Sequence, residues 1–220
     1  MEILRREGRR SLWFKLLGEL GYRRLYVVER PLDATLAESR CSLPLRLELL
    51  TERGVSDYLK HRAPGVCNPV RNPLRRDVAG RLDAGQYCFV TYYRGHMVGS
   101  IWAARAWVDV PYLRMEFQPA PGSVYLYDNR VDPELRGRGV AQALTHYARE
   151  GIKHWGFVRT VGLISPENLA SLRASQRAGS RVVARVGYLR MGPWRWMHCR
   201  RLVDGSLSPH GLPAFRLKAP

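Results

Sequence analysis

The chain has 220 residues, of which 45% are hydrophobic and 25% are charged, a composition typical of globular proteins and not of disordered ones. No apolar run approaches the roughly 20 residues of a membrane-spanning helix, and the charged N-terminus does not resemble a signal peptide, so we expect a cytoplasmic protein. The net charge of +17 favours an anionic partner, such as a nucleotide, an acidic carrier protein, nucleic acid or a membrane surface.

The first 40 residues are expected to form an N-terminal extension. The pattern predicts a basic amphipathic helix from Ile3 to Leu20, followed by a short strand from Tyr22 to Arg30 that Pro31 ends. A basic amphipathic helix can pack on its own domain or bind a membrane or a partner. The sequence leaves both possibilities open.

From Pro44 onward the hydrophobic pattern alternates between the periods of strands and helices. The expected elements are strands at 45–50, 86–94, 97–110, 123–131, 157–164, 181–189 and 194–202, and helices at 52–61, 73–82, 140–153 and 165–179. The last of these helices would have Ser165 as its N-cap and Pro166 at its first position, and Gly179 would end it.

The resulting order is β-α-α-β-β-β-α-β-α-β-β. It predicts an α/β fold in which helices cover both faces of a mixed sheet. We therefore expect three parts in the chain: the extension at 1–40, one folded domain at 41–204, and a flexible tail at 205–220 that is rich in Pro, Gly and Ser.

The stretch Asn129–Glu150 carries the strongest chemical signal. It reads as a strand end, a turn at Pro133, the loop Arg136–Gly139 and then an amphipathic helix. A helix N-terminus presents unpaired N–H groups and a partial positive charge, and glycines let a ligand approach the backbone closely. Such a loop is suited to bind a phosphate, although its spacing matches neither a P-loop nor a Rossmann motif. No cysteine or histidine group has metal-ligand spacing, so we expect no metal site.

A second segment extends this pattern, with Asn168 and Ser171 at the start of the next helix. Together with Val131-Asp132-Pro133, Arg136, Gly139 and Ala141, these residues resemble the motifs of the GCN5-related N-acetyltransferase (GNAT) superfamily. The resemblance covers about residues 44–203, including the order of elements. It implies a GNAT-like, splayed mixed sheet flanked by helices.

The resemblance also implies an enzyme, an acyl-CoA-dependent N-acyltransferase. The implied reaction moves an acetyl group from acetyl-CoA, or another acyl group from another acyl-CoA, to a primary amine of a small molecule or amino sugar. The amine would attack the thioester directly within a ternary complex.

The cofactor contacts follow from the same resemblance. The backbone of Val131 would bind the pantetheine arm of coenzyme A, while Asn168 and Ser171 would line its other side. The pyrophosphate would be bound by the backbone N–H groups of Arg136, Gly137, Arg138, Gly139, Val140 and Ala141.

The catalytic residues are less well defined by the resemblance. Ser175 stands where the family often has a tyrosine that protonates the leaving thiolate, and Tyr125 stands where it sometimes has a glutamate. A base must take the proton of the ammonium group. Glu116 and Asp109, near the preceding strands, could supply it.

Strand alternation adds an expectation about side-chain directions. Residues two apart on a strand share a face. Tyr125, Tyr127 and Asn129 should therefore share a face with Val131, with Asp128 on the opposite face.

Other functions stay open at this point. The donor could carry a longer acyl chain, on coenzyme A or on an acidic acyl carrier protein. The protein could also be a non-catalytic CoA-binding protein, or an accessory protein associated with nucleic acid or a membrane. The segment Arg190–Arg201 alternates aromatic and arginine residues, which suits base stacking but is equally typical of an ordinary amphipathic strand. Neither the acceptor nor the oligomeric state can be read from the sequence.

Overall fold

The computed structural model describes residues 22–33, 41–62, 73–191, 194–202 and 213–217. The chain forms two compact units. The central unit comprises residues 35–105 and 122–160, and the terminal unit comprises residues 1–34, 106–121 and 161–220. The predicted helix from Ile3 to Leu20 lies outside the described residues, and the three-part division at residues 40 and 204 remains a proposal.

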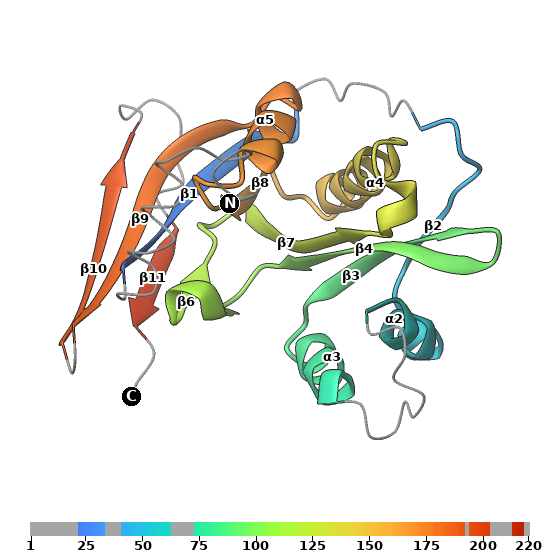
Figure 1. Ribbon diagram of the computed structural model, residues 1–220, viewed down its shortest axis with the longest axis horizontal. Coiled ribbons are helices and arrows are strands. Elements are labelled where there is room, and N and C mark those ends of the chain that lie inside the picture. The colour runs from blue at the N-terminus through green and yellow to red at the C-terminus, as the bar shows by residue number, and fades with distance from the viewer. Residues whose placement is uncertain (1–21, 34–40, 63–72, 192–193, 203–212, 218–220) are drawn as a thin grey trace, which may run out of the picture. The chain divides into compact units, whose positions relative to one another are not determined.

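The central unit is an antiparallel sheet with helices on both faces. Its strands, in spatial order, are β2 (Arg46–Leu49), β3 (Tyr87–Tyr93), β4 (His96–Ala104) and β7 (Ser123–Val131). Helix α4 (Val140–His154) covers one face, and α2 (Val55–Arg62) and α3 (Pro73–Asp83) cover the other (Figure 1). Two short 3-10 turns, η1 (Glu52–Gly54) and η3 (Pro133–Leu135), precede α2 and α4.

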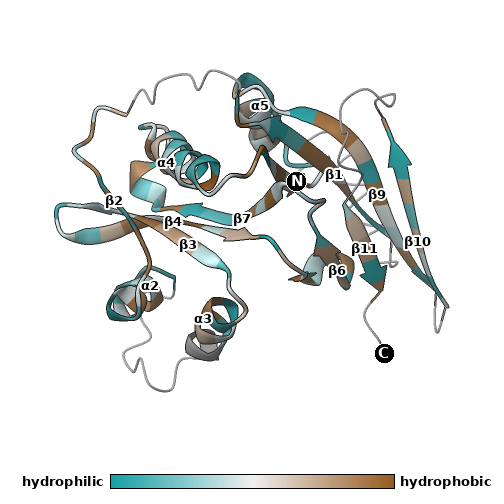
Figure 2. Ribbon diagram, turned by 180° about the vertical axis from the view of Figure 1, so that it is seen from behind, coloured by the Kyte–Doolittle hydropathy of each residue, from teal (hydrophilic) through white to brown (hydrophobic). Residues whose placement is uncertain are grey.

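Hydrophobic burial holds each helix on this sheet. Val140, Leu144 and Ile152 of α4 are buried, as the predicted apolar stripe requires, and Figure 2 shows hydrophobic and hydrophilic segments along the same helix. On the other face, Trp102 is fully buried in a cluster beneath α2 and α3, and its indole Nε1 donates to the hydroxyl of Tyr58 at 2.8 Å. That bond satisfies a polar group that would otherwise be costly to bury.

A β-bulge interrupts β7 at Asp128. The partner of Ser100 in β4 is Arg130, whereas the partner of Trp102 is Tyr127, so β7 holds one extra residue between these pairs. Asp128 has a φ of +51°, which aspartate tolerates better than most residues. The bulge resets the alternation of side chains along the end of the strand.

The predicted direction of side chains in β7 is therefore wrong beyond Tyr127. Tyr127 packs against the cluster beneath α2 and α3, and Asp128 lies on that same side, bonded to Arg62 of α2. Asn129 lies on the opposite side, where its amide donates to the hydroxyl of Thr145 in α4 at 3.3 Å. Simple alternation predicted Tyr127 and Asn129 on one face and Asp128 on the other, and it failed because it assumes a regular strand.

Within the part that the structure describes, the terminal unit contains two sheets and one helix. The first sheet has the order β10 (Trp194–Arg201), β9 (Arg181–Met191), β1 (Tyr22–Pro31) and β8 (Arg159–Ile164), and the first two of its pairings are antiparallel. The second is antiparallel, with the order β11 (Ala214–Leu217), β6 (Met115–Gln118) and β5 (Val108–Val110). The turn η2 (Pro111–Leu113) joins β5 to β6, and the helix is α5 (Leu169–Arg177).

The predicted order of elements from Pro44 onward is confirmed, together with the α/β fold class. One difference is that the strand predicted at 97–110 is two strands, β4 and β5, separated by residues 105–107, and that β6 was not predicted. Another is that part of the tail predicted to be flexible forms β11, in which Phe215 packs on Phe117 with ring centroids 5.0 Å apart. A short aromatic strand gains order by covering a neighbouring sheet edge, which local sequence does not reveal.

The start of α5 also differs from the prediction. The N-cap is Asn168 and the helix begins at Leu169, so Ser165 and Pro166 lie in the preceding loop. Helix α5 ends at Arg177 and is followed by Gly179 with a φ of +85°, as expected for a glycine just beyond a helix. Among the described residues, no helix is both long and apolar enough to span a membrane.

Candidate functional site

The loop before α4 in the central unit leaves backbone N–H groups open. Gly139 is the N-cap residue of α4 with a φ of +83°, and no side chain caps the helix. The first intrahelical bond runs from the N–H of Ala143 to the carbonyl of Gly139 at 2.9 Å. Among the described residues, the N–H groups of Gly137, Gly139, Val140, Ala141 and Gln142 therefore have no backbone acceptor. They are the donors that a helix N-terminus offers to an anion.

The backbone N–H groups of two residues in the predicted phosphate-binding loop are not open but have acceptors within the turn. The N–H groups of Arg136 and Arg138 bond weakly to the carbonyls of Pro133 and Leu135, at 3.3 and 3.4 Å. These bonds shape the turn, so Arg136 and Arg138 contribute mainly the positive charge of their side chains. Both residues are exposed.

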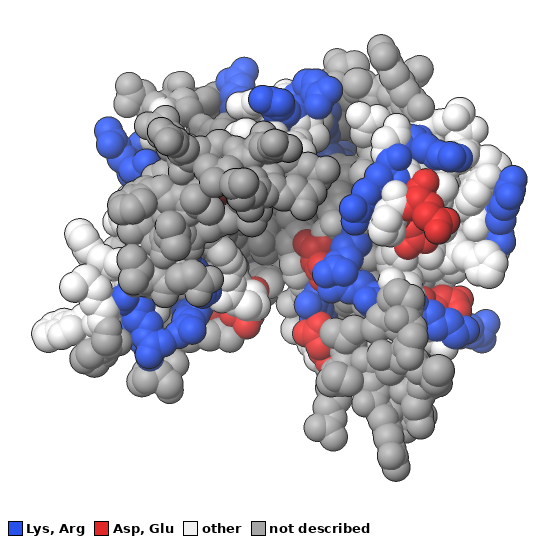
Figure 3. Space-filling model, in the orientation of Figure 1, with Lys and Arg blue, Asp and Glu red and all other residues white. Residues whose placement is uncertain are grey.

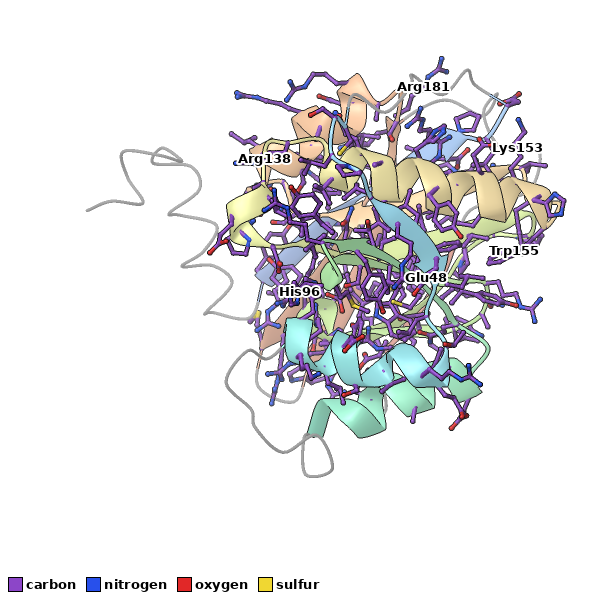
Figure 4. The ribbon with its side chains drawn as sticks, turned by 90° about the vertical axis from the view of Figure 1, so that its right-hand side faces the viewer. Glu48, His96, Arg138, Lys153, Trp155 and Arg181 are labelled. Carbon is purple, nitrogen blue, oxygen red and sulfur yellow. The ribbon has the colours of Figure 1, made fainter. Side chains whose placement is uncertain are left out.

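The positive charge of this loop adds to the positive N-terminal end of the α4 dipole. Figure 4 shows Arg138 at the N-terminal end of α4, with Lys153 and Trp155 at the opposite end. The helix is 15 residues long and adds about half a positive charge at its N-terminus. Open donors, two exposed guanidinium groups and two glycines with positive φ, Gly137 and Gly139, fit a phosphate or pyrophosphate group.

The second predicted segment lies in the terminal unit. The side-chain oxygen of Asn168 accepts a hydrogen bond from the N–H of Ser171 at 3.1 Å, which caps α5. This bond is sufficient to explain why an asparagine stands at that position. A role of Asn168 and Ser171 in binding coenzyme A remains a proposal.

The three predicted catalytic residues fall in different environments. Tyr125 is buried in the central unit and stacks on Tyr127, with ring centroids 5.0 Å apart. Burial raises the pKa of the Tyr125 phenol, so it is a weak acid and remains neutral. Glu116 of β6 pairs with Arg216 of β11, and Ser175 lies in α5, so both belong to the terminal unit.

A charged cluster beneath the end of β7 was missed by sequence reasoning. The carboxylate of Asp128 bonds to Arg62 of α2 at 2.9 Å and to Arg81 of α3 at 3.2 Å. Arg130 lies 3.7 Å from the same carboxylate. Only the bulge and the packing of two separate helices bring these residues together, so no local motif could have indicated them.

A histidine–aspartate pair lies beside this cluster. Nδ1 of His61, near the end of α2, is 3.0 Å from Oδ1 of Asp132, which directly follows β7. The side chain of His61 is only 4% exposed, that of Asp132 is 39% exposed, and the Asp132 backbone N–H is fixed on the Val98 carbonyl at 2.9 Å. Burial is the main cause that lowers the pKa of His61, and the Asp132 carboxylate opposes it. Within the described ranges, no group of three or more His, Cys, Asp or Glu residues could hold a metal ion.

Comparison with known proteins shows which family this chain resembles over most of its helices and strands. The model of the acetyltransferase (GNAT) family matches residues 56–179, from α2 to the end of α5. None of the curated proteins compared with this chain matches it.

Similar solved structures include a functionally unknown conserved protein from Staphylococcus epidermidis, with a TM-score of 0.53 and 12% identity over 87% of this chain and 68% of that protein. The aminoglycoside N-acetyltransferase AAC(6')-Iy, in complex with a bisubstrate analogue of coenzyme A, has a TM-score of 0.49 and 21% identity over 61% of this chain and 89% of that protein. An acetyltransferase from Trypanosoma brucei has a TM-score of 0.45 and 24% identity over 62% of this chain and 92% of that protein. The first of these similarities extends over most of the chain and concerns the fold alone.

Proposed function

Because this chain belongs to the GNAT family of acetyltransferases, we propose that it is an acyl-CoA-dependent N-acyltransferase that acetylates a primary amine of a small molecule or amino sugar. The observation that carries the proposal is the open N-terminus of α4, where five backbone N–H groups face no backbone acceptor in the described part of the chain. These donors, with Arg136 and Arg138, suit the pyrophosphate of coenzyme A.

The bound donor would supply an activated acetyl group. The amine nitrogen forms an amide bond with the acetyl carbonyl carbon, the carbon–sulfur bond breaks, and coenzyme A leaves as a thiol. The chain's own residues would bind and orient. We propose that Gly137 to Ala141 hold the pyrophosphate and that the backbone of Val131 binds the pantetheine arm.

Asn168 and Ser171 are proposed as further cofactor contacts, on the strength of the family motif. Tyr125, Glu116 and Ser175 are proposed as catalytic residues on the strength of the same resemblance. The burial of Tyr125 and the pairing of Glu116 with Arg216 both argue that these side chains serve mainly structural roles.

Cofactor binding can be tested with a thermal-shift assay. Acetyl-CoA should raise the melting midpoint of the wild-type protein, and a ligand at 100 times its Kd contributes about 2.7 kcal/mol. Gly139→Trp should abolish the shift, because a large side chain then occupies the N-terminus of α4. Gly95→Trp is the matched control, since Gly95 has nearly the same φ, +82°, in the turn between β3 and β4. The proposal fails if no acyl-CoA of any chain length shifts the wild-type midpoint.

Activity can be tested by measuring the release of free thiol from a panel of acyl-CoAs with a panel of amines. Release with acetyl-CoA and one class of amine supports the proposed function. Release only with longer chains, or only from an acyl carrier protein, favours the longer-chain alternative. Binding of acyl-CoA without release of thiol favours a non-catalytic CoA-binding protein. A salt-sensitive gel shift with RNA would indicate a nucleic-acid partner, and flotation with liposomes would indicate a membrane partner.

A further inference from the structure

His61 is a buried titratable side chain that none of the proposed steps uses. Both of its ring nitrogens are buried, and neither makes a well-aligned hydrogen bond within the described residues, although Nδ1 lies within ion-pair distance of Asp132. A buried polar atom without a hydrogen bond costs about 1–3 kcal/mol. Such an unsatisfied group calls for an explanation, and a catalytic role is one of the few explanations that apply to it.

The surroundings of His61 fix both its orientation and its charge. Asp132 faces Nδ1, so the neutral ring carries its proton there and leaves Nε2 with a free lone pair. Burial is the largest cause that lowers the pKa of His61, Asp132 raises it, and Arg62 and Arg130 lower it. The ring is therefore neutral at pH 7, in the state that can accept a proton.

The pair is also close in the chain to the proposed cofactor contact. Asp132 directly follows Val131, whose backbone is proposed to bind the pantetheine arm. The N–H of Asp132 is held by Val98 of β4, which places the carboxylate at a fixed point at the end of β7. Helix α2 brings the imidazole to that point from the face opposite α4 (Figure 1).

We infer that His61 accepts the proton that the acceptor's ammonium group must lose, and that Asp132 is the positioning residue that orients it. This inference rests on the proposed function. Nε2 is buried in this structure, so the transfer requires that the bound acceptor, or one water molecule beside it, displaces the groups that cover this nitrogen. The ammonium R–NH3+ then gives one proton to Nε2 and becomes the nucleophilic amine R–NH2. The resulting imidazolium is stabilised by Asp132 and later releases its proton to solvent, so charge and atoms balance.

The other polar side chains near the end of β7 are poorly suited to this task. Tyr125 and Tyr127 both have a raised pKa because they are buried. The carboxylate of Asp128 is engaged by Arg62 and Arg81. Among the described residues of this region, His61 alone combines a neutral state, burial and an unused lone pair.

The test is the pH dependence of kcat/KM, measured by thiol release with the best amine of the panel. The wild-type profile should rise with pH through a pKa below 6.5, because only neutral His61 is active. Asp132→Asn should move that limb to lower pH, since it removes the carboxylate that raises the pKa. Arg130→Gln should move it to higher pH, since it removes a charge that lowers the pKa. His61→Gln should lower kcat/KM about 100-fold or more and abolish its rise with pH in this range. The Kd for acetyl-CoA should stay unchanged.

A second readout is independent of acetyl transfer. The imidazole resonances of His61, assigned by their loss in His61→Gln, should titrate below pH 6.5 and move in the same opposite directions in Asp132→Asn and Arg130→Gln. His96→Gln is the control, because His96 is exposed at the start of β4. It should change neither the kinetics nor the titration of His61.

The outcomes separate the two proposals. If the wild-type protein binds acetyl-CoA but releases no thiol with any amine, the proposed function fails and this inference fails with it. If the wild-type protein is active and His61→Gln keeps its kcat/KM and its pH profile, only the inference fails. If His61→Gln does not fold, opposite shifts in Asp132→Asn and Arg130→Gln still support the inference, and unmoved limbs overturn it.

Discussion

Asp128 combines an unusual backbone conformation with a charge that two helices depend on. Its positive φ forms the bulge in β7, and its carboxylate binds Arg62 and Arg81, whose side chains are 12% and 22% exposed. Pairs that are this far removed from solvent are screened less than surface pairs. Loss of the Asp128 charge removes the carboxylate that Arg62 pairs with and leaves Arg81 with Asp77.

Asp128→Asn should therefore destabilise the protein by about 1.5–3 kcal/mol, the usual value of hydrogen bonds to charged groups. Asparagine tolerates positive φ as aspartate does, so the change isolates the loss of charge. Asp77→Asn is the control, because Asp77 pairs with the same Arg81 but is 49% exposed, and it should cost less than about 1 kcal/mol. Urea unfolding measures both variants, and equal losses would contradict this account.

At the scale of elements, two glycines of the central unit are expected to respond oppositely to alanine. Gly80 lies inside α3, and no heavy atom outside its own helix lies within 4 Å of an added Cβ. Gly80→Ala should stabilise the protein by about 0.5–1 kcal/mol, because alanine restricts the unfolded chain and favours helix.

Gly99→Ala should instead destabilise it, by about 1–3 kcal/mol. A Cβ at Gly99 would lie 2.8 Å from Cγ2 of Thr91 and 3.2 Å from the carbonyl of Arg130, with Leu144 of α4 at 3.4 Å. Gly99 thus lets α4 approach the sheet closely. Denaturant unfolding of both variants tests the contrast, and a stabilising Gly99→Ala would refute it.

The elements themselves were predictable because each follows a local period. The apolar stripe of α4 and the aromatic and β-branched residues of β3 each lie within one segment. The two glycines of the motif at Arg136–Ala141 likewise indicate its turn directly. The start of α5 was misplaced because Ser165 and Asn168 are both good N-cap residues, and only the fold decides between them. The pair of His61 and Asp132 joins residues 71 positions apart through packing, which no periodic pattern encodes.

At the scale of the whole molecule, the net charge of +17 is expected to affect anion binding mainly through the basic side chains nearest the bound anion. Basic side chains occupy more of the visible surface than acidic ones (Figure 3). At physiological ionic strength, however, charges separated by more than about 8 Å are largely screened. A general affinity for anionic partners remains a prediction from composition, and none of the protein comparisons supports it.

Binding of acetyl-CoA should accordingly weaken several-fold as salt rises from roughly 0.05 to 0.5 M, and most of that dependence should come from two residues. The double variant Arg136→Gln, Arg138→Gln should bind more weakly at low salt and lose most of the salt dependence. The control Arg200→Gln, Arg201→Gln removes two exposed charges from β10 and should change neither. Calorimetric titration at each salt concentration measures the effect, and an equal effect of both pairs would show that the charge acts as a whole.

The bulge at Asp128 has a consequence for how substrate preference could diverge among relatives of this protein. A relative that pairs this strand at the same length but without the bulge would shift the register of the next residues by one, so that the arginine now beside Asp128 would point toward α4 and the asparagine toward α2 and α3. Such a shift would rearrange the lining of the site without a single substitution in the strand. Comparisons that score only replacements would overlook the event, and variant libraries for this strand should therefore include changes that alter its register.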